Sequence, residues 1–155
     1  MRRPTSFPLL QRTVLLLLGT ACLSWAQFDT PPRGFGRGSV EAVVLSPDGG
    51  HLITSGSDGI YVYKAESLDD VAHLTLDPRP FHRDVGPVFS PDSRLLAMGY
   101  ADTTVVVWDM ESYTEAAILT GHEEWITALA FSDDSSLLAT GDRTGRMKVW
   151  SVDDW

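Results

Sequence analysis

Histidines are the first residues in this sequence to consider for chemistry, because a neutral imidazole can bind a metal ion or act as a general base. The chain has four of them, His51, His73, His82 and His122. No two stand at the spacing of metal ligands, and none pairs with the single cysteine, Cys22. The sequence therefore predicts no metal site, and we expect no cofactor.

A serine followed two residues later by an aspartate stands at the matching position of three repeated segments, and such pairs could supply a nucleophile or a carboxylate. The pairs are Ser46 with Asp48, Ser90 with Asp92, and Ser132 with Asp134. Their serines, called anchor serines below, lie 44 and then 42 residues apart. No base stands near them, and proline and aspartate at these positions are typical of tight turns. Because the pairs recur at the same position of each repeat, they indicate residues that stabilise a turn. The sequence therefore predicts no enzyme site.

The segments around each turn follow one plan, which predicts short antiparallel strands. The strands before the turns are expected at residues 41–45, 86–89 and 126–131. Those after the turns are expected at 51–55, 94–98 and 136–140, and each runs into a glycine. Third strands ending in an aromatic residue are expected at 60–63, 104–108 and 146–150, with outer strands at 72–76 and 115–119. A period of about 40 residues predicts stacked units that are too small to fold alone.

Several short motifs carry a family resemblance. In the third copy, Gly121-His122, Phe131-Ser132, Ala139-Thr140-Gly141 and Val149-Trp150 resemble one WD-repeat of the β-propeller family. Val107-Trp108-Asp109 in the second copy is similar to the signature Trp-Asp dipeptide. The resemblance implies an all-β fold, a partial WD40-type β-propeller with three blades of three to four antiparallel strands in an open array. The blades are expected at about residues 39–80, 81–120 and 121–155, and the implied function is a non-enzymatic protein-interaction scaffold.

The resemblance also implies a polar network inside each blade, in which a histidine, a serine or threonine, an aspartate and a tryptophan are hydrogen-bonded. The matching residues are Ser55 and Asp58 in the first copy, His82, Asp102 and Trp108 in the second, and His122, Thr140 and Trp150 in the third. No copy is complete, because Tyr63 replaces tryptophan, Met98 replaces serine, and Thr144 stands where aspartate belongs. A buried member left unpaired costs about 1–3 kcal/mol.

Partners of this family usually dock on the face formed by the loops that enter each blade and the turns before the third strands. The residues that map to this face are Arg83, Asp84, Tyr100, Glu123, Glu124, Trp125, Asp142 and Arg143. Trp125 is the strongest candidate, because tryptophan and arginine dominate the energetics of interfaces. The alternative is that Trp125 packs against a neighbouring blade. His51, which follows a turn, is expected to be solvated.

Three blades are fewer than the four to eight of a closed propeller. If each end of the array exposes about 500 Å² of apolar surface, each end lacks roughly 12 kcal/mol of the stabilisation that burying this surface would give. We therefore expect the chain to self-associate, to complete a partner's ring, or to be a piece of a longer protein. The rival from another class is a ligand-binding or enzymatic propeller with a site in its central channel.

The N-terminal 26 residues have the layout of a secretory signal peptide. Arg2, Arg3 and Arg12 make a basic start, an apolar core follows at 14–18, and Ser24-Trp25-Ala26 offers small residues for cleavage after Ala26. The sequence thus predicts a secreted or periplasmic protein, with a flexible proline- and glycine-rich linker at 27–38. The apolar segment is too short to span a bilayer, so no membrane span is expected in the mature chain. Alternatively, Gly19-Thr20-Ala21-Cys22 faintly resembles a bacterial lipoprotein box, which would attach a lipid anchor at Cys22.

The chain is acidic, with 12 lysines and arginines against 21 aspartates and glutamates and a net charge of −9. Removal of the three N-terminal arginines leaves nine basic residues and a charge of about −12. Such a chain is repelled by phosphate backbones, so nucleic acid is excluded as a partner, and anionic lipid surfaces are disfavoured. We interpret the negative net charge as favouring solubility.

Overall fold

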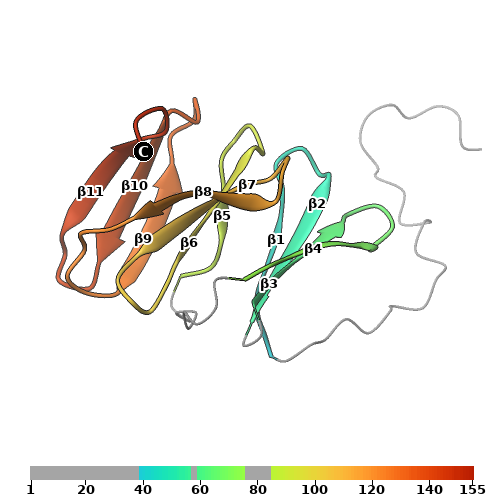
Figure 1. The fold of residues 1–155 in the computed structure, drawn as a ribbon, viewed down its shortest axis with the longest axis horizontal. Helices are drawn as coiled ribbons and strands as arrows, with labels where there is room; N and C mark the ends of the chain where they lie inside the picture. Colours follow the sequence, from blue (N-terminus) through green and yellow to red (C-terminus); the bar gives the residue numbers. More distant parts are fainter. Residues whose placement is uncertain (1–38, 57–58, 76–84) are drawn as a thin grey trace, which may run out of the picture. The chain divides into compact units, whose positions relative to one another are not determined.

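The computed structural model describes residues 39–56, 59–75 and 85–155, all within one compact unit of the chain, Gly36–Trp155. These residues form strands and turns without a helix (Figure 1), so none of them belongs to a helix that could cross a membrane. The expected signal peptide (1–26) and linker (27–38) lie outside the described residues. The same is true of four candidate residues, Asp58, His82, Arg83 and Asp84.

Eleven strands in the described residues make three antiparallel sheets (Figure 1). The first sheet contains β1 (Val40–Leu45), β2 (His51–Gly56), β3 (Gly59–Lys64) and β4 (Asp70–Leu74). The second contains β5 (Val88–Phe89), β6 (Leu95–Gly99), β7 (Val105–Asp109) and β8 (Thr114–Leu119), and the third contains β9 (Ile126–Phe131), β10 (Leu137–Asp142) and β11 (Met147–Ser151). Each strand pairs with the next along the chain. The expectation of an all-β fold with three open sheets of three to four strands is confirmed.

The anchor serines organise the first hairpin of each sheet. In the second sheet the hydroxyl of Ser90 donates to Oδ1 of Asp92 at 2.6 Å and accepts the N–H of Leu95 at 2.9 Å. The same carboxylate oxygen accepts the N–H of Arg94 at 3.1 Å. Ser46 with Asp48 and Ser132 with Asp134 repeat this pattern. The recurring serine–aspartate pairs are therefore turn elements, as the sequence predicts.

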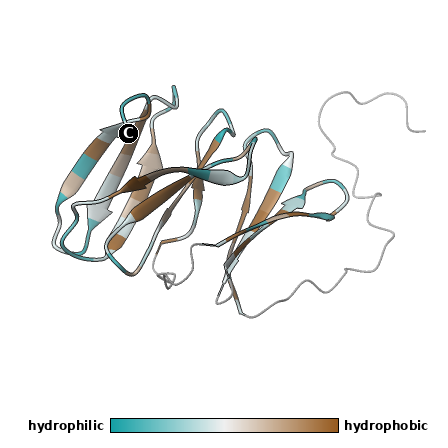
Figure 2. Ribbon diagram, in the orientation of Figure 1, coloured by the Kyte–Doolittle hydropathy of each residue, from teal (hydrophilic) through white to brown (hydrophobic). Residues whose placement is uncertain are grey.

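Two hydrophobic cores join the sheets. The core between the first and second sheets is made of Ile53, Ile60, Val62, Leu74, Phe89, Leu96, Met98, Tyr100, Val106, Trp108 and Met110. The core between the second and third sheets is made of Val85, Ala97, Val105, Val107, Ala117, Leu119, Ile126 and Leu138. Figure 2 shows that hydrophobic residues concentrate in the strands and hydrophilic residues in the turns. Each core thus needs two consecutive sheets, as expected of repeats that cannot fold singly.

Strand β7 shows how one short segment serves both cores. Successive side chains of a strand point to opposite faces of the sheet. Val106 and Trp108 accordingly pack toward the first sheet, and Val105 and Val107 pack toward the third. All three valines are completely buried, which contributes about 1.5–3 kcal/mol for each side chain.

Candidate functional site

His122 lies at the centre of a buried polar network in the third sheet. Its Nδ1 is 2.8 Å from Oδ2 of Asp142, and its Nε2 is 2.7 Å from Oγ1 of Thr140. The hydroxyl of Thr140 also accepts the indole N–H of Trp150 at 3.0 Å. A neutral imidazole with its proton on Nδ1 satisfies every contact, because Nδ1–H donates to the carboxylate and Thr140 donates to Nε2. The network ties the loop before β9 to β10 and β11.

Asp142 supplies the carboxylate that the sequence did not place. We expected this side chain on the partner-binding face, but it is buried and bonded to His122. The hydroxyl of Thr144 donates to its Oδ1 at 2.6 Å, and that bond and the one to His122 hold the pKa of Asp142 well below its usual range. The network is therefore complete in this sheet, and Asp142 is unavailable as a partner contact. The usable signal was that Asp142 is the one carboxylate in the β10–β11 turn.

The second sheet has the tryptophan of this network without its acceptor. Met98 is buried where the third sheet has Thr140, and the indole N–H of Trp108 has no acceptor among the described residues. Asp102 accepts the N–H and the hydroxyl of Thr104 and so organises the turn before β7. Tyr100, expected on the partner-binding face, is completely buried in the first core, and its placement at the surface was wrong.

The register of β2 corrects the assignment of Ser55. Counted from the anchor serines, the residue equivalent to Thr140 is Thr54 and not Ser55. Because side chains alternate along a strand, Ser55 shares the face of Ile53, which packs toward the second sheet. Thr54 lies on the opposite face. Ser55 precedes Gly56 as Thr140 precedes Gly141, but the two serine-to-glycine segments differ in length by one residue.

The other described histidines serve packing contacts. His51 is half-buried, and its Nε2 lies 2.9 Å from the hydroxyl of Tyr113, so the expectation of a solvated His51 is wrong. The ring of His73 stacks on Tyr61, with centroids 4.1 Å apart. Within residues 39–56, 59–75 and 85–155, no three His, Cys, Asp or Glu side chains cluster in a way that could hold a metal ion.

Four of the candidate partner-binding residues gather at one end of the third sheet, and we call Glu123, Glu124, Trp125 and Arg143 the Trp125 rim. All four are exposed, and Trp125 is 40% accessible. The guanidinium of Arg143 lies 5.7 Å from the centre of the Trp125 ring, and the Arg143 N–H donates to the Trp125 carbonyl at 2.9 Å. Glu123 forms an ion pair with Arg146. The rim thus presents a fixed aromatic ring between charges of both signs.

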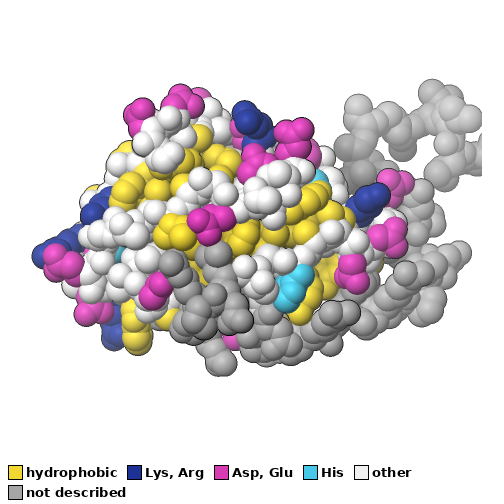
Figure 3. All heavy atoms as spheres, in the orientation of Figure 1, with side chains coloured by type: hydrophobic (Ala, Val, Ile, Leu, Met, Phe, Trp, Pro, Cys, Tyr) yellow, Lys and Arg dark blue, Asp and Glu magenta, His cyan; other side chains and the backbone are white. Residues whose placement is uncertain are grey.

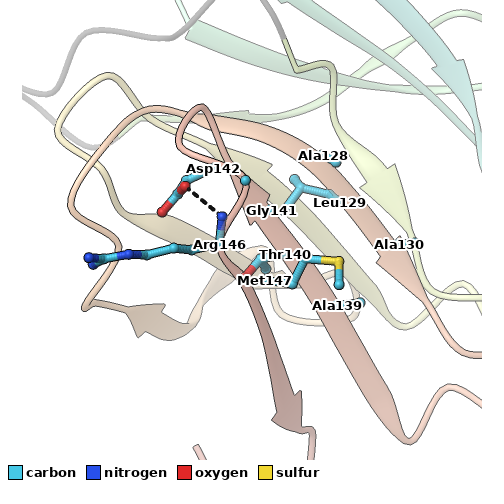
Figure 4. Close-up of a pocket in the computed structure, with 10 residues that line it drawn as sticks. Ala128, Leu129, Ala130, Ala139, Thr140, Gly141, Asp142, Arg146 and Met147 are labelled. Atoms are coloured by element: carbon cyan, nitrogen blue, oxygen red, sulfur yellow. Dashed lines mark hydrogen bonds between the residues drawn. The ribbon is translucent and has the colours of Figure 1, made fainter.

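One side of the third sheet is apolar and is not covered by any other described strand, and we call it the open face. It consists of Ala128 and Ala130 on β9, Leu137 and Ala139 on β10, and Met147 and Val149 on β11. A shallow hollow of about 300 Å³ lies on this face beside Thr140 and Gly141 (Figure 4). At its polar end, the N–H of Arg146 donates to Oδ1 of Asp142. The sequence predicts a bare apolar end but does not identify these six side chains.

The third sheet also ends on an unpaired edge among the described strands. The first two sheets each have a fourth strand, whereas β11 is the last strand of the third. A second groove, of about 480 Å³, runs beside this edge and is lined by residues of β8 and β11 and by Trp155. Figure 3 shows hydrophobic side chains across one view of the described part, with acidic and basic side chains mostly toward its margins.

Comparison with known proteins gives consistent similarities. The family described as "WD domain, G-beta repeat" matches three segments, residues 32–61, 82–109 and 113–151. The chain is 27% identical over 114 residues to "Pre-mRNA-processing factor 19 homolog 2" of Arabidopsis thaliana, covering 73% of this chain and 21% of that protein. It is 26% identical over 117 residues to "Apoptotic protease-activating factor 1" of Danio rerio, covering 76% and 9%. It is 35% identical over 99 residues to "Probable cytosolic iron-sulfur protein assembly protein 1" of Kluyveromyces lactis, covering 57% and 28%. The chain thus spans less than a third of the length of each of these relatives.

Proposed function

The chain belongs to the WD-repeat family, and from this membership we propose that it is a non-enzymatic protein-interaction scaffold that associates through the open face of its third blade. The three sheets are the blades of a partial propeller. The Trp125 rim is proposed as a second contact surface, used by a protein partner once the open face is covered. Because a fold alone does not determine function, the choice of partner depends on the residues of these two surfaces.

One observation carries this proposal: the same positions are buried in the second blade and bare in the third. Val105 and Val107 on β7 are completely buried against the third blade. The residues at the corresponding positions of β11, Met147 and Val149, are 84% and 65% exposed. The open face therefore has the composition of an inter-blade interface without the blade that would cover it, and exposed apolar patches of this kind mark association sites.

The chemistry of the Trp125 rim supports its proposed role. A tryptophan side chain with its ring held by an arginine loses little conformational freedom on binding, and such residues dominate interface energetics. The flanking carboxylates of Glu123 and Glu124 favour a partner with basic groups next to an apolar anchor. With 40% of its surface exposed, Trp125 is accessible to such a partner.

The proposal is tested by capture with matched baits. The full chain, its Val149→Asp variant and its Thr114→Asp variant are immobilised and exposed to extract from the source organism. Val149→Asp places a charge on the open face, whereas Thr114→Asp places the same charge on an exposed position of β8. We expect partners that the wild type and Thr114→Asp retain and that Val149→Asp loses. Identical sets of captured proteins on all three baits would contradict the proposal.

We also propose that the chain is exported, with cleavage after Ala26. The support is the basic start, the short apolar core and the small residues at the cleavage site, with Cys22 lipidation as the alternative. Mass spectrometry of the N-terminal peptide, carried out on the cytoplasmic and the exported fractions, tests both. A chain beginning at Gln27 supports export by cleavage after Ala26, a lipidated chain beginning at Cys22 supports the alternative, and an intact N-terminus in the cytoplasm contradicts both.

A further inference from the structure

A hydrogen bond between anchor turns joins each pair of consecutive blades. The N–H of Asp48 donates to Oγ of Ser93 at 3.0 Å, and the N–H of Asp92 donates to Oγ of Ser135 at 3.2 Å. Each donor lies two residues after its own anchor serine, and each acceptor lies three residues after the next one. The contact therefore has a direction, with the donor on the preceding blade and the acceptor on the following blade.

Two positions of this series have no counterpart among the described blades. Asp134 holds the donor position of the third blade, and Gly49 holds the acceptor position of the first. Gly49 has a φ of 73°, close to the 64° of Ser93 and the 60° of Ser135. A Cβ on Gly49 would meet no atom within 4 Å. Gly49 thus has the backbone conformation of an acceptor serine but no hydroxyl.

The apolar side chains at the two ends are also complementary halves of the internal interfaces. The residue before each anchor serine is Leu45, Phe89 or Phe131. Phe89 is buried in the first core, and Phe131 packs against the second. Leu45 is 55% exposed, and with Val40 and Val43 it forms what we call the outer face of the first blade. One chain therefore carries both sides of the interface that it uses twice internally.

We propose that the open face is occupied by the outer face of the first blade in a second copy of this chain, docked head to tail. The inference rests on the proposed function, because it names the partner of the open face. Two sets of the three described blades, joined at both pairs of faces, make six blades, within the four to eight of closed propellers. Such a heterologous contact produces a ring when its rotation closes. The contact would use the same positions as the internal interfaces, with Leu45 in place of a phenylalanine and with Gly49 lacking the acceptor hydroxyl.

The first test measures the molar mass of the full chain by light scattering over a wide range of concentration at physiological salt, which screens the repulsion between two acidic copies. We expect a dimer that dissociates on dilution. Leu45→Asp and Val149→Asp change exposed residues on the two opposite faces, so each variant should keep its circular dichroism spectrum and become monomeric.

Mixing these two variants distinguishes a head-to-tail contact from other dimers. The intact open face of Leu45→Asp can still bind the intact outer face of Val149→Asp, so the mixture should recover dimers. A dimer formed by two identical faces would give a different result. If two open faces met, Leu45→Asp would stay dimeric on its own, and if two outer faces met, Val149→Asp would do so. In neither case would mixing restore a dimer that both variants had lost.

The second test adds the missing acceptor. Gly49→Ser should tighten the dimer by roughly fivefold for each contact formed, the effect of one hydrogen bond. Gly49→Ala is the matched control, because it introduces the same backbone strain without a hydroxyl, and it should not tighten the dimer.

The inference is overturned by a monomer at every concentration for both the wild type and Gly49→Ser. It is likewise overturned by mixed variants that stay monomeric, or by Gly49→Ser and Gly49→Ala dimerising equally. If the chain is monomeric but the capture experiment still shows partners lost by Val149→Asp, the second copy is excluded and the proposed function stands. If Val149→Asp changes neither result, the proposed function fails as well.

Discussion

Trp150 donates its indole N–H to the hydroxyl of Thr140 at 3.0 Å, and the second blade has no equivalent of this hydrogen bond among the described residues. The equivalent indole of Trp108 is buried beside Met98 and has no acceptor in the described part of the chain. Both tryptophans lie near the end of the third strand of their blade, but only the Trp150 side chain is hydrogen-bonded to a side chain of the neighbouring strand. The third blade, although it has an uncovered face, therefore has the more complete internal network.

Thr140→Val is expected to destabilise the chain by about 1–3 kcal/mol. Valine has nearly the same shape, but without the hydroxyl it leaves the Trp150 N–H and His122 Nε2 unpaired at a buried site. Urea unfolding followed by tryptophan fluorescence measures the change. Thr54→Val, at the equivalent position of the first blade, is the control and should cost less. Equal losses for both variants would mean that the network contributes nothing specific.

The acid stability of the chain should depend on Asp134. Hydrogen bonds from the hydroxyls of Ser132 and Ser136 and the N–H of Ser136 lower the pKa of Asp134 from 3.8 to about 2. Because the folded pKa is depressed, the stabilisation is fully present above about pH 4 and is lost as the pH falls toward 2.

Asp134→Asn should therefore flatten the fall of stability between pH 4 and pH 2, measured by urea unfolding at a series of pH values. Asp133→Asn, which changes the adjacent carboxylate, is the control and should leave the slope in that window closer to that of the wild type. A wild-type slope in Asp134→Asn would show that this turn does not govern acid sensitivity.

The strands and turns of this fold could be predicted because each is encoded locally. Apolar segments on either side of a Ser-Pro-Asp or Ser-Asp-Asp turn, with a glycine at the end of the second strand, specify a hairpin without reference to distant parts of the chain. The expected strand at 126–131 is β9 with the same bounds. The outer strand expected at 72–76 appears as β4, two residues earlier in the chain, and the one expected at 115–119 appears as β8, which begins one residue earlier. Their repetition also predicted the stacking of three sheets.

The polar network was harder to predict because it depends on register. Whether Thr54 or Ser55 faces the network is decided by which residues of β2 and β3 pair, and a one-residue shift reverses every side chain. Asp142 was missed because a carboxylate was sought at the position of Thr144, whereas the turn brings one from two residues earlier. The burial of Tyr100 depends on the first blade packing over it, which no local pattern shows.

Ser93→Ala should weaken the contact between the first and second blades by about 0.5–1.5 kcal/mol. Alanine keeps the left-handed backbone of Ser93 but removes the hydroxyl that accepts the Asp48 N–H. Thermal or urea unfolding of the variant measures the loss. Ser67→Ala, which removes an exposed hydroxyl bonded only within its own loop to Asp69, is the control and should stay within about 0.5 kcal/mol of the wild type. A similar loss in both would remove the bond between turns as a determinant of blade stacking.

Gly99→Ala should destabilise the chain, because Gly99 lies where the second blade meets the third. A Cβ at this position would stand 2.9 Å from Cβ of Ile126, closer than two such atoms tolerate. Relieving this clash requires the third blade to shift, and overpacking of this kind costs about 1–3 kcal/mol.

Gly141 occupies the same position in the third blade and provides the matched control. A Cβ there would lie 3.6 Å from Cβ of Ala128, an ordinary contact on the open face, so Gly141→Ala should be neutral or slightly stabilising for folding. Both variants are compared by urea unfolding at a protein concentration low enough to keep copies apart. Since the two glycines differ chiefly in whether a following blade covers them, equal effects on folding would show that the tight fit against Ile126 does not limit how the blades stack.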